Sequence, residues 1–351
     1  MQDFGILIGF LISFVICIIA IPSIIKVAIS KGLYGINRKK TEKRQNVPTL
    51  GGLAIFAGIL VSLNLFTDFY SFPELPYITA GAIGLFFIGL KDDILVTAPW
   101  WKLLGQILAA LVICIPGGLR IQAPGSLLGL AGGGENLEVL ITVLLIITII
   151  NSYNLIDGID GLAAGIGMLS SIVFGIIFYR DGLTSWALMS AAIVGSLMGF
   201  LWYNVFSRRK KIYMGDTGSL LLGFLLSIMS VRFLNIQKPH GLFIEIQTPL
   251  ALVLAVFIIP LFDTLRIIIV RIVQGHSPFR PDRQHIHYRM VDLNLSHRMV
   301  TGILTGLNFV MIILVVALQD LGELILIGLL VLMTLILSTI PTLVSKRKRS
   351  N

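Results

Sequence analysis

One polar stretch decides how this chain folds: Asn151-Ser152-Tyr153-Asn154-Leu155-Ile156-Asp157-Gly158-Ile159-Asp160-Gly161. It separates two apolar runs, residues 137–150 and 162–178. With their flanks, these runs approach the ~20 residues that a helix needs to cross a bilayer. We therefore expect the chain to cross a membrane, turn at this stretch and cross back.

The polar side chains of this stretch are regularly spaced. If the helix continues through them, Asn154, Asp157 and Asp160 fall at successive i, i+3 positions and share one broad face. An ionisable side chain at the edge of a membrane span is costly, and its presence there favours a functional role. The alternative is that these residues, with Gly158 and Gly161, only end a helix, because Asn, Asp and Gly are favoured at helix ends.

The composition of the 351-residue chain excludes a soluble globular protein. Hydrophobic residues make up 56% and charged residues 13%, and the mean hydropathy is +0.93, all far from the usage of soluble proteins. We predict an all-α polytopic integral membrane protein, a single domain over residues 1–351 with about 10–11 transmembrane helices. The predicted spans are 4–25, 50–66, 77–91, 102–119, 137–155, 162–179, 183–203, 217–233, 248–271, 299–318 and 323–343.

Basic residues are unevenly distributed around these spans. Of the 27 Lys and Arg residues, 22 fall in segments on one predicted side of the membrane. By the positive-inside rule that side is cytoplasmic, which puts the N-terminus outside and the C-terminus inside. Topology and attraction to anionic lipid heads thus explain the net charge of +9, and no nucleic-acid partner is expected. The cytoplasmic loops are predicted near residues 26–49, 91–102, 151–161, 207–216 and 272–298.

Two adjacent carboxylates, Asp92 and Asp93, directly follow the third predicted span. At a membrane edge they repel each other unless a cation lies near them. The pair suits a divalent metal site or a general base. The alternative is a solvated acidic pair.

A glycine-rich segment, residues 213–219, opens another predicted helix. Asp216 is placed to cap the N-terminus of that helix. The alternative is that the flanking glycines let a metal–phosphate group approach, because helix N-termini favour anions and a carboxylate there can hold a hard cation.

In the first cytoplasmic loop, Lys43 and Arg44 are either phosphate ligands or topology signals.

The late loop, residues 275–298, concentrates His285, His287 and Arg283 with further arginines. His285 and His287 alternate, so no regular helix face holds both. Such a loop suits a polyanionic ligand. The alternatives are a transition-metal site and a basic loop that touches lipid head groups. Two further histidines without a supporting group of polar residues are interpreted as structural: His240 and His297.

All these polar groups fall on the predicted cytoplasmic side, where their chemistry can be combined. Carboxylates in excess without thiols select a hard ion such as Mg²⁺, with Mn²⁺ as a substitute. Arginines, histidines and glycine-rich helix starts suit phosphates. The chain therefore points to phosphoryl transfer between a soluble diphosphate donor and a lipid acceptor in the bilayer.

At this point the chain resembles a known family, the polyprenyl-phosphate N-acetylhexosamine-1-phosphate transferases (the MraY/WecA group, glycosyltransferase family 4). The resemblance covers nearly the whole chain, and its six motifs stand in the order of the family. The motifs are Val47-Pro-Thr-Leu-Gly-Gly52, Asp92-Asp93, Asn154-Leu-Ile-Asp157-Gly-Ile-Asp160-Gly, Met214-Gly-Asp216-Thr-Gly-Ser219, Asp263-Thr-Leu-Arg266 and Asp282-Arg-Gln-His285-Ile-His287.

The resemblance implies transfer of a sugar 1-phosphate from a UDP-N-acetylhexosamine to undecaprenyl phosphate, with release of UMP, at the cytoplasmic face of a bacterial inner membrane. Asp216 would hold Mg²⁺, Asp92 would activate the lipid phosphate, and Tyr213 would stack on uracil. The expected catalytic residues are Asp92, Asp93, Asp157, Asp160, His285 and His287. The expected substrate-binding residues are Arg44, Lys102, Asn154, Asp157, Asp160, Tyr213 and Arg283. The expected metal ligands are Asp216 and Asp93.

Two positions depart from motifs of the family. Val96 stands where some members have a third acid, and Tyr288 stands where the late motif often has a further histidine. The form of the late motif is similar to the WecA/TagO branch, which implies UDP-N-acetylglucosamine as donor and a product for surface polysaccharide or teichoic acid. The rival donor is the MurNAc-pentapeptide nucleotide of the MraY branch, and the rival class is a cation-coupled transporter. The resemblance is also consistent with a homodimer.

Overall fold

The protein is described by a computed structural model that covers residues 2–34, 47–67, 72–95, 97–122, 134–207, 209–236, 239–241, 245–275 and 285–350. These residues form helices almost throughout, and the one β pairing among them is an isolated bridge between His240 and Glu245. The helices are α1 (Gln2–Ser30), α2 (Gly51–Phe66), α3 (Leu75–Leu95), α4 (Pro99–Cys114), α6 (Glu135–Ile156), α7 (Leu162–Arg180), α8 (Thr184–Leu201), α9 (Gly215–Leu234), α10 (Pro249–Val256), α11 (Ile258–Val273), α12 (Ile286–Asp292), α13 (His297–Ala317) and α14 (Glu323–Ser350).

The prediction of an all-α polytopic membrane protein is confirmed. Within the described residues, six helices are long and apolar enough to cross a membrane, namely α1, α6, α7, α8 with its π-helical end, α9 and α13. The bent pair α10–α11 would make a seventh span. Shorter apolar helices include α2, α4 and the first part of α14. The side of the membrane that each end faces stays a prediction.

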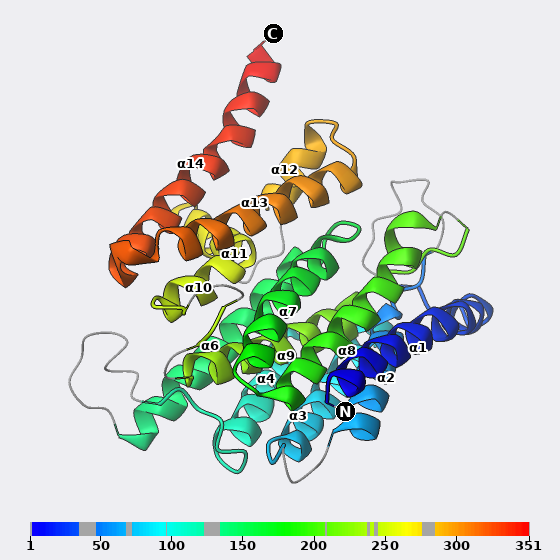
Figure 1. Cartoon of the computed structure of the whole chain (residues 1–351). Helices are drawn as coiled ribbons and strands as arrows, with labels where there is room; N and C mark the ends of the chain where they lie inside the picture. Colours follow the sequence, from blue (N-terminus) through cyan, green and yellow to red (C-terminus); the bar gives the residue numbers. More distant parts are fainter. Residues whose placement is uncertain are drawn as a thin grey trace.

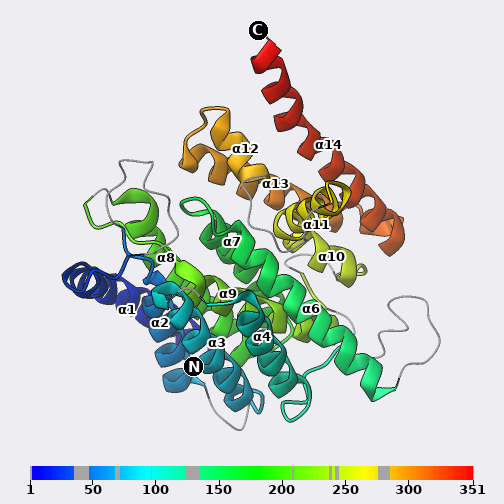
Figure 2. The ribbon, with the colours of Figure 1, turned by 180° about the vertical axis from the view of Figure 1, so that it is seen from behind.

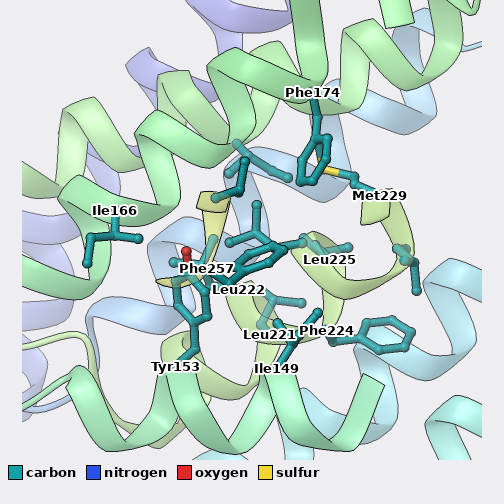
Figure 3. Packing of buried hydrophobic residues seen from close by; sticks show 14 of the residues in the cluster. Ile149, Tyr153, Ile166, Phe174, Leu221, Leu222, Phe224, Leu225, Met229 and Phe257 are labelled. Atoms are coloured by element: carbon teal, nitrogen blue, oxygen red, sulfur yellow. The ribbon is translucent and has the colours of Figure 1, made fainter. Parts of the chain in front are cut away.

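Helix α9 is the central element of the first part of the chain. It contacts α2, α3, α6 and α7, and 89% of its apolar window is buried. A helix that is hydrophobic on all sides needs such an enclosed position. Figure 3 shows part of its core, where Leu221, Leu225 and Met229 of α9 lie among residues of α6 and α7, next to Phe257. The Tyr153 hydroxyl in this core lies 3.2 Å from Ser170 Oγ, which pairs both polar groups.

Glycines bring the backbones of α2 and α3 against the start of α9. A Cβ on Gly52 would lie 2.2 Å from Gly218 N, and a Cβ on Gly89 would lie 2.5 Å from Thr217 Cα. The segment before α2 is also hydrogen-bonded to the segment before α9, because Gly51 N donates to Tyr213 O at 2.9 Å. Backbone approach of this kind tolerates only glycine.

The predicted single span 248–271 is wrong in one respect, because the structure divides it into α10 and α11, which meet at an angle of 75°. The break lies at Phe257, three residues before Pro260. Proline has no N–H for the carbonyl four residues earlier, and its ring clashes with that carbonyl. The sequence-based span passed through Pro260 as if it were an ordinary helical residue.

The helices α10–α14 form a second group beside the first (Figures 1 and 2). Helix α10 packs on α13 and α14, while α11 also contacts α6 of the first group. The C-terminal end of α14 extends away from the other helices (Figure 1). Residues that carry chemistry therefore come to the site from two helical groups.

Candidate active site

The stretch 151–161 consists of the end of α6 and the turn that follows it, so the helix does not continue as far as Asp160. Helix α6 ends at Ile156, Asp157 has non-helical dihedrals, and Gly161 has a φ of 81° immediately before α7. The left-handed conformation at Gly161 is one that a side chain would strain. The expected common face is therefore wrong: Asn154 Nδ2 donates to Ser219 Oγ of α9 at 2.9 Å, whereas Asp160 faces other partners.

Two of the predicted acids share one cation. Asp92 Oδ2 lies 2.7 Å from Lys102 Nζ, and Asp216 Oδ2 also forms an ion pair with that ammonium group. The other oxygen of Asp92 accepts hydrogen bonds from Thr97 N at 2.7 Å and Thr97 Oγ1 at 2.6 Å. Helices α3, α4 and α9 thus place two carboxylates and a lysine in one cluster, which we call the acid–lysine cluster.

Asp93 lies beside this cluster but makes different contacts. Its Oδ1 accepts from Asp216 N at 2.8 Å, and its Oδ2 accepts from Thr217 N at 3.0 Å and from Thr217 Oγ1 at 2.6 Å. These amides belong to the first turn of α9, whose N–H groups have no partner within the helix. Asp93 therefore caps α9 from α3, and the alternative that Asp216 caps its own helix is wrong.

Asp160 is the centre of a second cluster. Its Oδ2 lies 2.6 Å from Lys211 Nζ and 3.1 Å from His297 Nδ1, and its backbone carbonyl accepts from Thr301 Oγ1 at 2.7 Å. Burial acts to raise the pKa of Asp160, but the hydrogen bonds from His297 and Lys211 outweigh it and hold the pKa below its usual value. Lys211 Nζ also lies 5.5 Å from the centre of the Tyr213 ring.

The interpretation of His297 as a histidine without polar partners is therefore wrong. His297 is the first residue of α13, and 137 positions separate it from Asp160. No local pattern in the sequence indicates a contact over that distance. Lys211, which stood out only as a topology signal, was missed for the same reason.

His285 and His287 form a third cluster around Asp263 of α11. His285 Nδ1 lies 2.9 Å from Asp263 Oδ2, and Ile286 N donates to Asp263 Oδ1 at 3.0 Å. Arg266 donates to the same Oδ1 at 3.0 Å. The two histidine rings stack with centroids 5.4 Å apart, although they flank the start of α12 and not one face of a helix. Asp263 is the residue that brings them together, although the sequence analysis names it only as part of a motif.

His287 is buried with one ring nitrogen unpaired. Burial lowers the pKa of His287 to about 4, so the imidazole is neutral near pH 7. Within the described part of the chain, its Nε2 has no hydrogen-bond partner. This atom faces Gly158, since a Cβ there would lie 2.5 Å from it. The glycine between the two acids of the 151–161 turn thus makes room for His287.

The three clusters meet along the turn at 151–161. Asn154 contacts α9 one turn beyond Asp216, Gly158 adjoins His287, and Asp160 belongs to the second cluster. Two predicted ligands, Arg44 and Arg283, lie outside the described residues, as does Val96. The structure therefore brings together the predicted acids and both histidines of the late motif, and their individual roles stay predictions.

The acid–lysine cluster fits a hard cation by the chemistry of its donor atoms. The oxygens Asp92 Oδ2 and Asp216 Oδ2 already converge on one ammonium group. Within the described ranges, no three His, Cys, Asp or Glu residues form a ready-made metal cage. Mg²⁺ commonly takes only one or two carboxylates and completes its shell with water and substrate phosphate.

Comparisons with known proteins show the family of this chain. A model described as glycosyl transferase family 4 matches residues 75–234. A Bacillus subtilis protein named "Probable undecaprenyl-phosphate N-acetylglucosaminyl 1-phosphate transferase" is 33% identical over 322 residues, 90% of this chain and 85% of the relative. This chain belongs to glycosyl transferase family 4.

Similar proteins are also found in Escherichia and Mycobacterium. The Escherichia coli O157:H7 undecaprenyl-phosphate alpha-N-acetylglucosaminyl 1-phosphate transferase is 31% identical over 291 residues, 80% of this chain and 75% of the relative. The Mycobacterium leprae decaprenyl-phosphate N-acetylglucosaminephosphotransferase is 33% identical over 280 residues, 72% of this chain and 68% of the relative. The resemblance seen in the six motifs is thereby confirmed. The family 4 match at 75–234 includes the acid–lysine cluster and the 151–161 turn.

Proposed function

We propose that this chain transfers N-acetylglucosamine 1-phosphate from UDP-N-acetylglucosamine to undecaprenyl phosphate and releases UMP. The names of its relatives in Bacillus, Escherichia and Mycobacterium support a polyprenyl phosphate acceptor and an N-acetylglucosamine 1-phosphate group. The reaction would take place at the cytoplasmic face of a bacterial inner membrane. It would begin the synthesis of a cell-surface polymer.

The observation that carries the proposal is the convergence of Asp92 and Asp216 on one cation at the start of α9. Reactions between a diphosphate and a phosphate bring several negative charges together, so the site must supply positive charge. Lys102 supplies one such charge, and Asp216 would hold Mg²⁺ or Mn²⁺, which neutralises and orients a diphosphate when bound. Asp93 keeps the start of α9 in place, and a direct contact of Asp93 with the metal is a separate prediction.

The remaining residues would bind the two substrates. Thr97 fixes Oδ1 of Asp92, which leaves Oδ2 to orient the lipid phosphate or accept its proton. Asn154, Asp157 and Tyr213 would contact the nucleotide. The neutral His287 has its Nε2 against Gly158 of the 151–161 stretch, where it would donate a hydrogen bond to a phosphate oxygen of the nucleotide donor or accept one from a sugar hydroxyl.

Two rival functions are less well supported. The donor of the MraY branch is not favoured, because the relatives are named for N-acetylglucosamine. A cation-coupled transporter places its carboxylates near the bilayer midplane on broken helices. Here Asp92 lies in the last turn of α3, Asp216 in the first turn of α9, and Asp160 between two helices. Asp263 does follow the break between α10 and α11, but His285 and Arg266 already pair with its carboxylate.

The test is release of UMP by the purified protein in detergent with undecaprenyl phosphate and Mg²⁺. UDP-N-acetylglucosamine, UDP-N-acetylgalactosamine and the UDP-MurNAc-pentapeptide are compared, each with and without a chelator. We expect release only with UDP-N-acetylglucosamine and only with metal. Release with the pentapeptide donor alone would assign the protein to the rival branch, and no release from folded protein would refute the transferase.

A further inference from the structure

The break between α10 and α11 leaves two buried backbone groups in need of partners. Pro260 has no N–H, so Val256 O lacks the donor that a continuous helix would provide. Asn308 of α13 replaces it, because its Nδ2 donates to Val256 O at 3.1 Å. The same side chain accepts from Ile259 N, with Oδ1 at 3.5 Å.

Asn308 is fully buried at the centre of α13, and the residues that follow it in this helix, 309–317, are all apolar. A carboxamide has both a donor and an acceptor, so one side chain can satisfy the carbonyl that ends α10 and an amide that begins α11. Inside a membrane protein no water replaces these bonds, and broken helices persist only where such partners exist. The position of Asn308 is therefore explained by the break between α10 and α11. An ordinary apolar packing position would not need a carboxamide.

The other end of α10 is also fixed by the segment that follows α13. Glu323 Oε1 accepts from Ala251 N in the first turn of α10. Gln319 Oε1 accepts from Gln247 N, and Gln319 Nε2 donates to Glu245 O, both at 3.1 Å. Helix α10 is thus held at its start by Glu323 and Gln319 and at its end by Asn308.

The direction of α11 decides where Asp263 lies. This carboxylate is five residues after the first residue of α11 and is bonded to His285 Nδ1 and Ile286 N. If the 75° bend opened, Asp263 would leave the start of α12, and His285 and His287 would lose their common partner. The bend is therefore coupled to the geometry of the third cluster.

We propose that Asn308 is a positioning residue that fixes the bend between α10 and α11 and, through Asp263, the place of His285 and His287 in the active site. The expected effect on kcat rests on the proposed function. The effect of Asn308 on the geometry of the bend does not. Asn308 touches no substrate. It acts by satisfying Val256 O and Ile259 N in the bent conformation alone.

The kinetic test compares Asn308→Leu with Asn64→Leu, a matched variant in α2. Asn64 is exposed, and among the residues that the structure describes its side chain bonds only to Leu60 O of its own helix. We expect Asn308→Leu to lower kcat for UMP release at least tenfold, with the Mg²⁺ concentration for half-maximal rate unchanged, because Asp92 and Asp216 lie on other helices. Asn64→Leu should keep the wild-type kcat. A wild-type kcat in folded Asn308→Leu would overturn the proposal.

The geometric test measures the bend without using activity. Spin labels at Ile269 of α11 and Val310 of α13, both half-exposed, report the distance between the helices by pulsed electron spin resonance. The buried Cys17 and Cys114 are first replaced by alanine. Asn308→Leu should shift or broaden the distance distribution, and Asn64→Leu should not. An unchanged distribution in Asn308→Leu would overturn the proposal even if the wild type released no UMP.

A second variant separates positioning from stability. Pro260→Ala adds an N–H that can bond Val256 O, but only if α10 and α11 straighten into one helix. In the Asn308→Leu background, we expect Pro260→Ala to restore the melting temperature and to leave kcat at least tenfold low. Recovery of both properties would show that Asn308 acts on stability alone and would overturn the positioning role.

Discussion

Neighbouring acids at the end of α3 have different partners, and their chemistry follows from this. Asp92 shares Lys102 with Asp216, whereas Asp93 accepts three hydrogen bonds from the first turn of α9. Their position in the sequence alone does not separate the two carboxylates, and only the family resemblance implied different roles, with Asp92 at the lipid phosphate and Asp93 at the metal. Successive residues of a helix point in different directions, so Asp92 and Asp93 face different neighbouring helices. The packing of those helices decides which partners each carboxylate has.

Substitution of Asp93 should therefore act on stability, and substitution of Asp92 on activity. We expect Asp93→Ala to lower the free energy of unfolding by about 2 kcal/mol, because it removes a helix cap and its hydrogen bonds. Asp92→Asn keeps the Thr97 contacts and should cost well under half of that, with UMP release at least a hundredfold slower. Denaturant unfolding in detergent and initial rates provide the measurements. Equal stability of the two variants would contradict the capping role.

The pH dependence of stability should carry the signature of His287. Its pKa of about 4 in the folded protein lies below the usual value near 6.5. Between these values the unfolded chain binds more protons, so the free energy of unfolding should fall as pH drops from 6.5 to 4, by up to ~1.4 kcal/mol per unit. Asp160, with its lowered pKa, adds a loss only at more acidic pH. Urea unfolding across this range should show a shallower slope for His287→Gln than for the wild type.

At the scale of the helices, single polar pairs connect elements that carry the site. Asn151 Nδ2 donates to Gln106 Oε1 at 2.7 Å, and Gln106 Nε2 donates back at 3.3 Å. Gln106 follows Lys102 by one turn of α4, and Asn151 precedes Asn154 by about one turn of α6. This reciprocal pair therefore fixes the register between α4 and α6 one helical turn from Lys102 of the acid–lysine cluster.

The contribution of the Gln106–Asn151 pair can be tested by substituting each residue with leucine, singly and together. Gln106→Leu and Asn151→Leu should each lower stability, because each leaves a buried amide without its partner. The double Leu variant should be less destabilised than the sum, with a coupling energy of roughly 1 kcal/mol or less, as for other interhelical bonds in membranes. Strict additivity in thermal unfolding would show that the two side chains do not interact.

At the scale of the whole molecule, the site lies where two groups of helices meet. The first group, which encloses α9, supplies Asp92, Lys102 and Asp216, and the second supplies Asp263 and the two histidines. Residues 154–160 connect the clusters of both groups. A substrate that contacts the acids and the histidines would therefore hold the two groups together.

The orientation of the whole molecule in the membrane gives a further prediction. The excess of Lys and Arg on one side puts the C-terminus in the cytoplasm and the N-terminus outside. A protease-cleavable tag at each end should therefore be cut only at the N-terminus when intact spheroplasts are treated. Cleavage of the C-terminal tag in sealed cells would reverse the predicted topology and place the site on the outer face.

Hydrophobic runs and polar motifs along the chain were enough to determine the class of protein and its family, and they supplied the candidate site residues, whose individual roles stay predictions. Contacts between residues far apart in the chain decided the rest: the cap of Asp93 on α9, the contact of His297 with Asp160, and the role of Asp263. Periodicity records which residues share a helix face, but it carries no information on which face meets which across 22 to 137 positions of chain. Burial of apolar faces and the need to pair polar groups away from water select those contacts only when all helices are packed.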